Sequence, residues 1–167
     1  MEQKGFDRLL DACYRLLQKG LSSFRLFIIG EGPQRPILEQ QIKIMGLENI
    51  VYLMGFKENP YPYLRHADVF LLSSRDESFS LVIGESLIVG TPSIATNCCG
   101  VDEWLEGGVY GLIVDNSTDG IYDGMYRALT EPDILAQYRS RIPEAQQKIS
   151  FEAMLKDFET ILETEYE

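Results

Sequence analysis

Residues 69–96 read VFLLSSRDESFSLVIGESLIVGTPSIAT, and this stretch decides the fold class. Two short apolar runs, Val69–Leu72 and Pro92–Thr96, have the length of buried strands. The segment between them is longer and apolar in its second half, which predicts a helix that begins near Phe79 or Ser80. A strand, a helix and a second strand in this order are typical of a parallel sheet, because parallel neighbours need a crossover connection.

The same alternation of strand-like and helix-like segments runs through the rest of the chain. Apolar residues recur at helical spacing from Phe6 to Leu17, and short continuous apolar runs separate the helical segments. Further strands are expected at residues 24–29, 50–54 and 111–115, and further helices up to Met45, at Tyr61–His66 and from Thr118 onward, with breaks at Pro132 and near Pro143 and a last amphipathic helix at 151–162. Continuous apolar strands that alternate with helices indicate an α/β domain with a doubly wound parallel sheet, helices on both faces and helices at its C-terminal end.

Length, composition and charge restrict the class of protein. The chain has 167 residues, of which 45% are hydrophobic, and this is enough for one domain with a sizeable core. The formal net charge of −11 argues against nucleic acid as a partner, because a protein that binds the phosphate backbone needs a basic surface. No apolar run reaches the length of a membrane-spanning helix, so we expect no direct membrane span.

Cysteine and histidine usage favours neither a disulfide framework nor a metal site. The three cysteines are Cys13, Cys98 and Cys99, and two adjacent cysteines rarely bond to each other because the geometry is strained. The chain has no CxxC motif, and its single histidine, His66, cannot build a metal site alone. We therefore expect a reducing cytoplasmic setting and no metal or other cofactor.

Glu85 stands inside an otherwise apolar run, and Glu77 lies eight positions before it. An ionised glutamate buried in such a run costs several kcal/mol unless a partner satisfies it. Protein groups therefore pair with Glu85, or its carboxylate is kept for a polar ligand.

The spacing of the two glutamates also permits a binding function. Glu77 precedes the predicted helix and Glu85 lies in its second turn, so the free amides of the first turn form an anion site between them. A nucleotide-diphospho-sugar presents sugar hydroxyls, a diphosphate and ribose hydroxyls in the same order. The alternative is that Glu77 only interacts favourably with the positive end of the helix dipole, and that Glu85 is a core acid paired with an arginine. Arg75 beside the segment either neutralises Asp76 or Glu77 or faces the diphosphate.

Motifs around this segment resemble those of the retaining family 4 glycosyltransferases of GT-B fold. The segment Glu77–Glu85, followed by Gly90–Thr96, is similar to the signature of that family. Further matches occur in the same order along the chain at Lys4-Gly5-Phe6, Gly30-Glu31-Gly32-Pro33, Gly55-Phe56, Ala67–Leu71 and Gly100-Val101-Asp102-Glu103. Several linked motifs, extending from Lys4 to about Val114, are more specific than any one of them.

The resemblance implies a Rossmann-like domain that binds the sugar donor. It assigns two catalytic residues, Glu77 at the hydroxyls of the donor sugar and Lys4 at the diphosphate, and it assigns Glu85 to the ribose. The other donor-binding residues that it implies are Phe79, Ser80 and Leu81 near the diphosphate, Gly30 and Gly32 in the turn after the first strand, and Phe56 and Lys57 beside the base. The family is retaining and usually needs no metal.

The resemblance also implies how the chain relates to a whole enzyme. Residues 1–167 are expected to form one donor-binding domain, with the N-terminal acceptor-binding domain absent from this chain. The expected donor is a UDP-sugar and the expected acceptor a glycan or lipid-linked glycan of bacterial-type polysaccharide biosynthesis. Any membrane association is expected through the missing half, and this domain alone is expected to be inactive. The rival hypothesis is a non-catalytic nucleotide-binding or signalling α/β domain, although a phospho-receiver needs clustered acids where this chain has Gly30-Glu31-Gly32.

Two departures from the family pattern affect the predicted site. The family commonly has glycine on both sides of the motif phenylalanine, where this chain has Ser78 and Ser80. Serine resists positive φ, so the path of the backbone there is in question. The family also has a strand ending in Gly-Arg just before the lysine, and we expect that strand and its arginine to be missing before Lys4.

Overall fold

The computed structural model describes residues 2–131 and 133–149, which form five strands and seven α-helices. The strands are β1 Leu26–Ile29, β2 Val51–Gly55, β3 Phe70–Leu72, β4 Ser93–Thr96 and β5 Gly111–Val114. The helices are α1 Phe6–Gln18, α2 Arg35–Ile44, α3 Tyr61–His66, α4 Leu81–Val89, α5 Val101–Leu105, α6 Thr118–Thr130 and α7 Ile134–Lys148, with 3-10 turns at Glu2–Lys4 and Glu106–Gly108. The order of strands and helices confirms the predicted α/β class.

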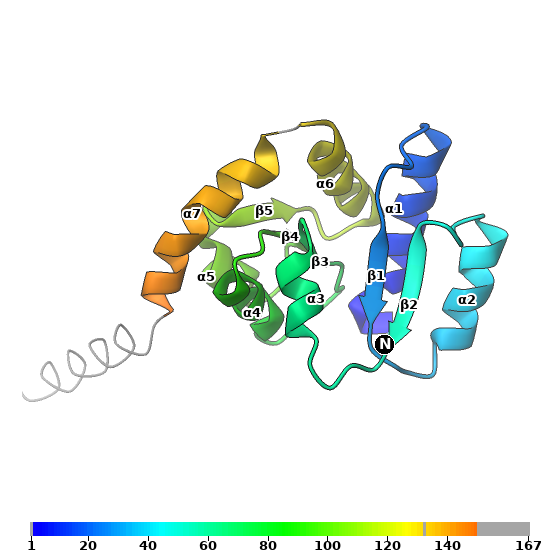
Figure 1. Ribbon diagram of the computed structural model, residues 1–167, viewed down its shortest axis with the longest axis horizontal. Coiled ribbons are helices and arrows are strands. Elements are labelled where there is room, and N and C mark those ends of the chain that lie inside the picture. Colours follow the sequence, from blue (N-terminus) through cyan, green and yellow to red (C-terminus); the bar gives the residue numbers. More distant parts are fainter. Residues whose placement is uncertain (1, 132, 150–167) are drawn as a thin grey trace, which may run out of the picture.

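All strand pairs are parallel, as the apolar strands predict, but the strands form two sheets (Figure 1). One sheet has the order β1-β2 and the other the order β3-β4-β5. Among the described residues no strand joins the outer edge of β1 to that of β3. A cavity of about 1880 Å³ lies there, lined by residues of both strands, and we call it the β1–β3 groove.

Helices cover both faces of the three-stranded sheet because neighbouring residues of a strand point to opposite sides. Ile94 packs with residues of α6 and α7, whereas the next residue, Ala95, packs with residues of α4 and α5. The same alternation separates Leu112 from Ile113 in β5. Both faces of this sheet are therefore buried under helices, as the continuous apolar strands in the sequence predict.

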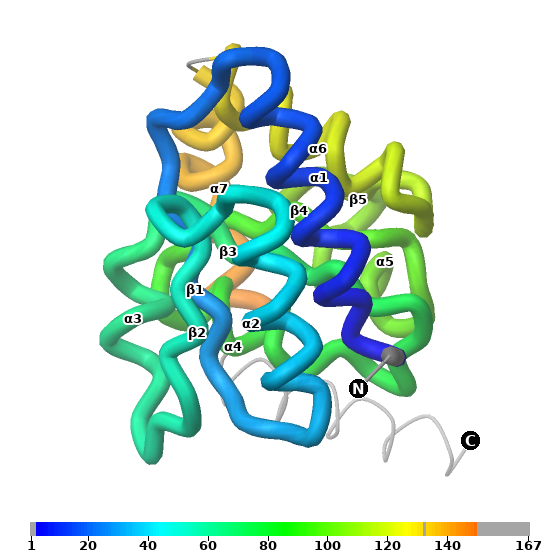
Figure 2. The backbone as a smooth tube through the Cα atoms, turned by 90° about the vertical axis from the view of Figure 1, so that its right-hand side faces the viewer, coloured from blue at the N-terminus to red at the C-terminus, as the bar shows by residue number. Residues whose placement is uncertain are grey.

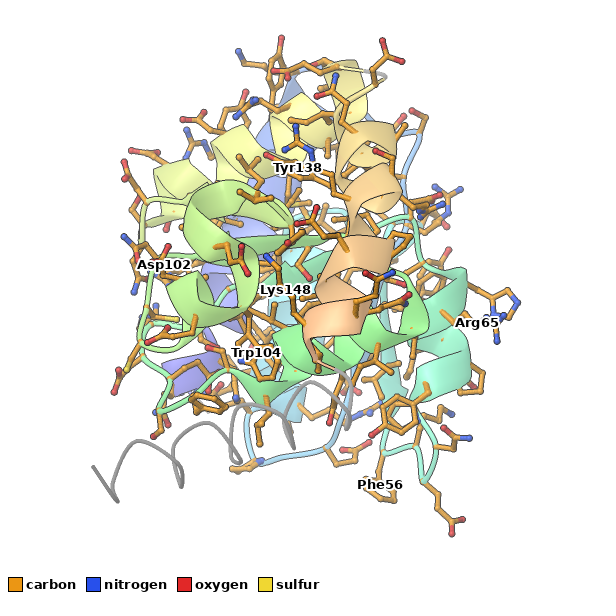
Figure 3. The ribbon with its side chains drawn as sticks, turned by 90° about the vertical axis from the view of Figure 1, so that its left-hand side faces the viewer. Phe56, Arg65, Asp102, Trp104, Tyr138 and Lys148 are labelled. Carbon is orange, nitrogen blue, oxygen red and sulfur yellow. The ribbon has the colours of Figure 1, made fainter. Side chains whose placement is uncertain are left out.

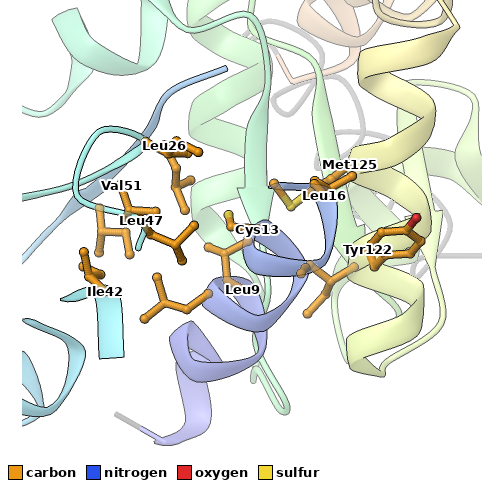
Figure 4. Close-up of a cluster of buried hydrophobic side chains, with 14 of the residues drawn as sticks. Leu9, Cys13, Leu16, Leu26, Ile42, Leu47, Val51, Tyr122 and Met125 are labelled. Atoms are coloured by element: carbon orange, nitrogen blue, oxygen red, sulfur yellow. The ribbon is translucent and has the colours of Figure 1, made fainter. Parts of the chain in front are cut away.

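The largest buried cluster lies around α1 (Figure 4). Leu9, Cys13 and Leu16 are on the apolar stripe of this helix, which is the stripe that the sequence predicts. This stripe packs between the β1–β2 sheet with α2 on one side and α6, including Met125, on the other. Figure 2 shows α1 and α2 beside each other in front of the two-stranded sheet. Burial raises the pKa of the Cys13 thiol to about 12, so this cysteine acts as an apolar core residue.

The region after β4 departs from the predicted elements in two places. Helix α5 was not expected, and it is only five residues long. The break predicted near Pro143 is wrong, because Pro143 lies inside α7. A proline inside a helix removes one backbone hydrogen bond at a cost of about 3 kcal/mol, but Ile142 and Ala145 on either side of it are both buried in the core. The helix predicted at 151–162 lies outside the described residues.

No helix in the described part of the chain has the length and apolar character that spanning a bilayer requires.

Candidate functional site

The predicted site residues gather at the carboxyl ends of the strands. Gly30 follows β1, Phe56 follows β2, and Ser73 follows β3. Loops at this edge are where open parallel sheets bind ligands. Six of the predicted residues line the β1–β3 groove, namely Lys4, Gly30, Gly32, Phe56, Lys57 and Glu85. The other four, Glu77, Phe79, Ser80 and Leu81, lie on the segment that enters α4, and Glu77 reaches the groove through Lys4.

Glu77 is held by two donors. Lys4 Nζ and Ser74 Oγ each donate to Glu77 Oε1 at 2.6 Å. The carboxylate side chain is 14% exposed, whereas that of Lys4 is 48% exposed. Burial alone raises the pKa of Glu77, but the hydrogen bonds from Lys4 and Ser74 outweigh it and hold that pKa below its ordinary value. Glu77 is therefore an oriented anion, and Lys4 keeps exposed N–H donors for another anion.

The position of Lys4 is set by contacts to its backbone, and to that of Gln3, from residues just after β3. The Ser73 hydroxyl donates to the Lys4 carbonyl at 2.8 Å, and the Arg75 amide donates to the Gln3 carbonyl at 2.7 Å. Gly5 has φ +66°, and a Cβ at this position would collide with the Ser73 carbonyl oxygen. A glycine is thus required just after Lys4 for conformation and for space.

Two arginines, Arg75 and Arg8, support this corner. Arg75 donates to both carboxylate oxygens of Asp7 through its two terminal guanidinium nitrogens, at 2.8 and 2.5 Å. Arg8 Nη2 donates to the Ser73 carbonyl at 2.7 Å, and its Nη1 donates to Asn116 at 3.2 Å. The sequence carries no signal for these contacts, because both join α1 to loops far along the chain.

Glu85 has no cationic partner among residues 2–131 and 133–149. The residue is half-buried in α4, and the Tyr61 hydroxyl lies 3.5 Å from its carboxylate on the exposed side, at the outer limit of a hydrogen bond. The alternative in which an arginine pairs with Glu85 is therefore wrong for this part of the chain. The carboxylate lines the β1–β3 groove and is open to a polar ligand.

Ser80 lies at the start of α4 in the left-handed conformation, with φ 45° and ψ 39°. It does not cap the helix through its side chain, because its hydroxyl donates to the Cys99 carbonyl at 3.1 Å. Phe79 and Leu81 on either side are 52% and 64% exposed. Serine thus adopts at this position the conformation for which the resembled motif commonly uses glycine.

The remaining predicted residues form the rim of the groove. Gly30 donates its amide to the Gly55 carbonyl at 2.9 Å, which ties the loops after β1 and β2 together. Phe56 projects at the edge of the molecule and is 74% exposed (Figure 3). Lys57 lies over the ring of Tyr63, with its Nζ 5.8 Å from the ring centre. These two side chains add an apolar face and a positive charge to the lining of the groove.

Metal ligands do not gather at this site. In the described part of the chain no group of three histidine, cysteine, aspartate or glutamate side chains is placed to hold a metal ion.

Acid is expected to weaken the fold through two carboxylates of this corner. The pKa of Glu77 is below its ordinary value of 4.5, and the hydrogen bonds from Arg75 hold the pKa of Asp7 below 3.8. The unfolded chain therefore takes up protons at these groups first as the pH falls. Their contribution to stability is complete above about pH 5 and is lost as the pH falls through the lower pKa values of the folded protein.

Thermal melts between pH 7 and 3 test this expectation. We expect the Tm of the variant Asp7→Asn/Glu77→Gln to fall less steeply with acid than that of the unmodified protein. Parallel curves for the two proteins would contradict it.

Residues 1–131 match the family model of the glycosyl transferases group 1. The chain is 31% identical over 140 residues to the 2-deoxystreptamine N-acetyl-D-glucosaminyltransferase of Niallia circulans, covering 82% of this chain and 36% of that protein. It is also 31% identical over 144 residues to a lipopolysaccharide core biosynthesis glycosyltransferase of Rhizobium meliloti, covering 86% of this chain and 40% of that protein.

Solved structures with the same fold include two proteins of about twice this length. The lipopolysaccharide outer core galactosyltransferase WaaB superposes with a TM-score of 0.82 at 20% identity, covering 98% of this chain and 46% of that chain. HepE of Anabaena, solved with UDP and glucose, superposes with a TM-score of 0.79 at 23% identity, covering 98% of this chain and 46% of that chain. This chain therefore has the Rossmann-like fold of one domain of the GT-B proteins and spans less than half the length of these relatives. Because the family model matches residues 1–131, well over half of its length, the chain belongs to the group 1 glycosyl transferases.

Proposed function

We propose that this chain is the donor-binding domain of a retaining glycosyltransferase that uses a UDP-sugar. The observation that carries the proposal is Glu85, a half-buried residue that lines the groove with no cation paired to its carboxylate among the described residues, while Lys4 and Ser74 orient Glu77 just before α4. A groove lined by an unpaired acceptor, Glu85, and by an exposed lysine, Lys4, suits a ligand with ribose hydroxyls and a diphosphate.

The proposed role of each residue follows from its chemistry. Glu85 accepts hydrogen bonds from the ribose hydroxyls, and Lys4 donates to the diphosphate beside the amides that begin α4. Glu77 accepts from the hydroxyls of the donor sugar. The backbone around Gly30 and Gly32 lies close to the donor, and Phe56 and Lys57 border the base.

In this proposal, the whole enzyme accelerates the reaction mainly by stabilising the leaving group, the nucleoside diphosphate. As the bond to the sugar breaks, negative charge develops on the departing diphosphate. Lys4 and the amides at the start of α4 stabilise this charge, and preorganised donors of this kind supply a large part of catalysis in many enzymes. The charge can be neutralised by these groups without a metal ion.

The acceptor lies outside this chain in our proposal. The relatives include proteins named for lipopolysaccharide core biosynthesis and for transfer to 2-deoxystreptamine, which supports a glycan or another sugar-bearing acceptor. The remaining part of a longer protein supplies the acceptor-binding surface. The isolated domain is expected to bind the donor and to transfer no sugar.

Thermal melting with UDP, GDP and ADP tests the proposal. A ligand at about 100 times its Kd stabilises a protein by about 2.7 kcal/mol, which for this size of domain is a rise in Tm of about 5–10 °C. We expect this rise with UDP. The absence of any shift with all three nucleotides at millimolar concentration would contradict the donor site. UDP is favoured over other nucleotides because it is the ligand recorded with the structural neighbour HepE.

Glu77→Ala separates donor binding from nucleotide binding. Because Glu77 contacts the sugar in our proposal, the variant should bind UDP with an affinity within about threefold of that of the unmodified protein. The unmodified protein should bind UDP-glucose more tightly than UDP by about the free energy of one hydrogen bond, and the variant should lose this difference. Calorimetric titration with both ligands measures this. Equal losses for UDP and UDP-glucose would assign Glu77 to the nucleotide instead, and equal affinities in the unmodified protein would favour the non-catalytic nucleotide-binding alternative.

A further inference from the structure

Ser80 holds a backbone conformation that its own side chain disfavours. Its φ of 45° is in the left-handed region, and an L-residue other than glycine pays about 1–2 kcal/mol there. The residue is also 4% exposed, so water does not stabilise the turn. Such a conformation persists only where the surrounding structure fixes it.

Contacts from the region of α5 fix this turn. The indole Nε1 of Trp104 donates to the Phe79 carbonyl at 3.1 Å, which is the peptide unit that leads into Ser80. The rings of Phe79 and Trp104 meet edge to face, with centres 5.6 Å apart. The Ser80 hydroxyl donates to the Cys99 carbonyl just before α5, at 3.1 Å.

Two glycines make these close contacts possible. A Cβ on Gly84 of α4 would lie 2.7 Å from the Trp104 ring, so the indole packs directly on the helix backbone (Figure 3). A Cβ on Gly100 would lie 2.7 Å from the Phe79 Cα. The chain therefore has small residues at both places where the turn and the indole are approached most closely.

We propose that Trp104 is a positioning residue, whose indole N–H holds the Phe79 carbonyl and thereby keeps the segment from Glu77 to Leu81 in its binding conformation. This inference rests on the proposed function, because that segment carries two of the proposed donor contacts. It explains how serine occupies a left-handed position: the energy of the turn is offset by contacts from Trp104 and Cys99. A segment ordered before the ligand arrives costs less conformational entropy on binding.

A purely structural role for Trp104 makes a different prediction. In that case the ring only fills space beside Val101 and Leu105 in the core, and its loss lowers the global stability without a specific effect on the turn. The hydrogen bond must therefore be removed while the shape of the ring is kept. Trp104→benzothienylalanine does this, since sulfur replaces the indole N–H. Trp104→Phe is a second variant, and Tyr110→Phe is a matched control, because it removes a polar atom from a buried aromatic ring that bonds Glu144 and Lys148 instead.

Hydrogen exchange and UDP titration form the test. We expect the amide of Ile83, which donates to the Ser80 carbonyl at 2.9 Å, to exchange about fivefold to tenfold faster in the benzothienylalanine variant. We expect the same variant to bind UDP about fivefold to tenfold more weakly, the effect of one hydrogen bond. Its Tm should fall by less than about 4 °C, and Tyr110→Phe should change neither the exchange nor the affinity.

Exchange rates and UDP affinity that stay within about twofold of the unmodified protein would overturn the inference, since one hydrogen bond is worth more than that. A protein that binds no UDP in any form would refute the proposed function, and the exchange of the Ile83 amide alone would then decide the role of Trp104.

Discussion

Gly5→Ala is expected to destabilise the protein by about 3 kcal/mol or more, among the largest effects of any single substitution in this chain. The left-handed conformation at φ +66° costs an alanine about 1 kcal/mol or more. The new Cβ would also collide with the Ser73 carbonyl oxygen, and a backbone atom cannot rotate away as a flexible side chain can. We therefore expect a fall in Tm of about 10 °C in thermal melts.

Gly20→Ala is the matched control for this effect. Gly20 also has positive φ, at +81°, but nothing lies within 4 Å of the position that its Cβ would occupy. The control therefore carries the conformational cost without the collision, and its Tm should fall by about 3 °C. Equal losses for the two variants would contradict the close packing of residues 4–5 against the end of β3, and with it the placement of Lys4.

Glu85→Ala is expected to weaken UDP binding by about 100-fold, measured by calorimetric titration. Hydrogen bonds to a charged group are worth about 1.5–3 kcal/mol each, and the carboxylate would accept from ribose hydroxyls in a partly desolvated groove. The fold should change little, because the contact with Tyr61 is long and no cation among the described residues pairs with Glu85. Alanine also has a higher helix propensity than glutamate, which favours α4 slightly.

Glu48→Ala controls for the loss of one negative charge, since Glu48 is exposed in the loop between α2 and β2, away from the groove. It should leave the affinity for UDP unchanged. A Glu85→Ala variant that binds UDP as tightly as the Glu48→Ala variant would exclude a ribose contact. A large fall in Tm without ligand would show instead that Glu85 supports the core.

The fold class could be predicted because local pattern decides it. The apolar stripe of α1, the short run of β3 and the apolar strand β4 each report burial directly, and the structure confirms all three. Pattern does not report which strand edges meet, so the division into two sheets was not visible. The predicted helix break near Pro143 was wrong for a similar reason. The helix continues through this proline because Ile142 and Ala145 pack against residues far away in the sequence, which a local pattern does not reveal.

The site could be predicted in part. Glu85 was found because a carboxylate in an apolar helix is an energetic exception. Whether a cation pairs with it was left open, and the structure places none beside it among the described residues. The contact between Lys4 and Glu77 joins residues 73 positions apart, and the Arg75–Asp7 pair joins residues 68 positions apart. The hydrogen bond from Trp104 to the Phe79 carbonyl likewise joins two residues that lie 25 positions apart. Long-range pairs of this kind leave no local signal in a single sequence.

Titration of the ¹⁵N-labelled protein with UDP-glucose, followed by amide chemical shifts, tests the central claim most directly. If Glu77 and Glu85 bracket the donor, the largest changes will occur at residues 79–83, around Lys4 and in the loop from Gly30 to Gly32. They will be lost in Glu85→Ala. Saturable changes centred elsewhere, or no change at millimolar UDP-glucose, would contradict the account.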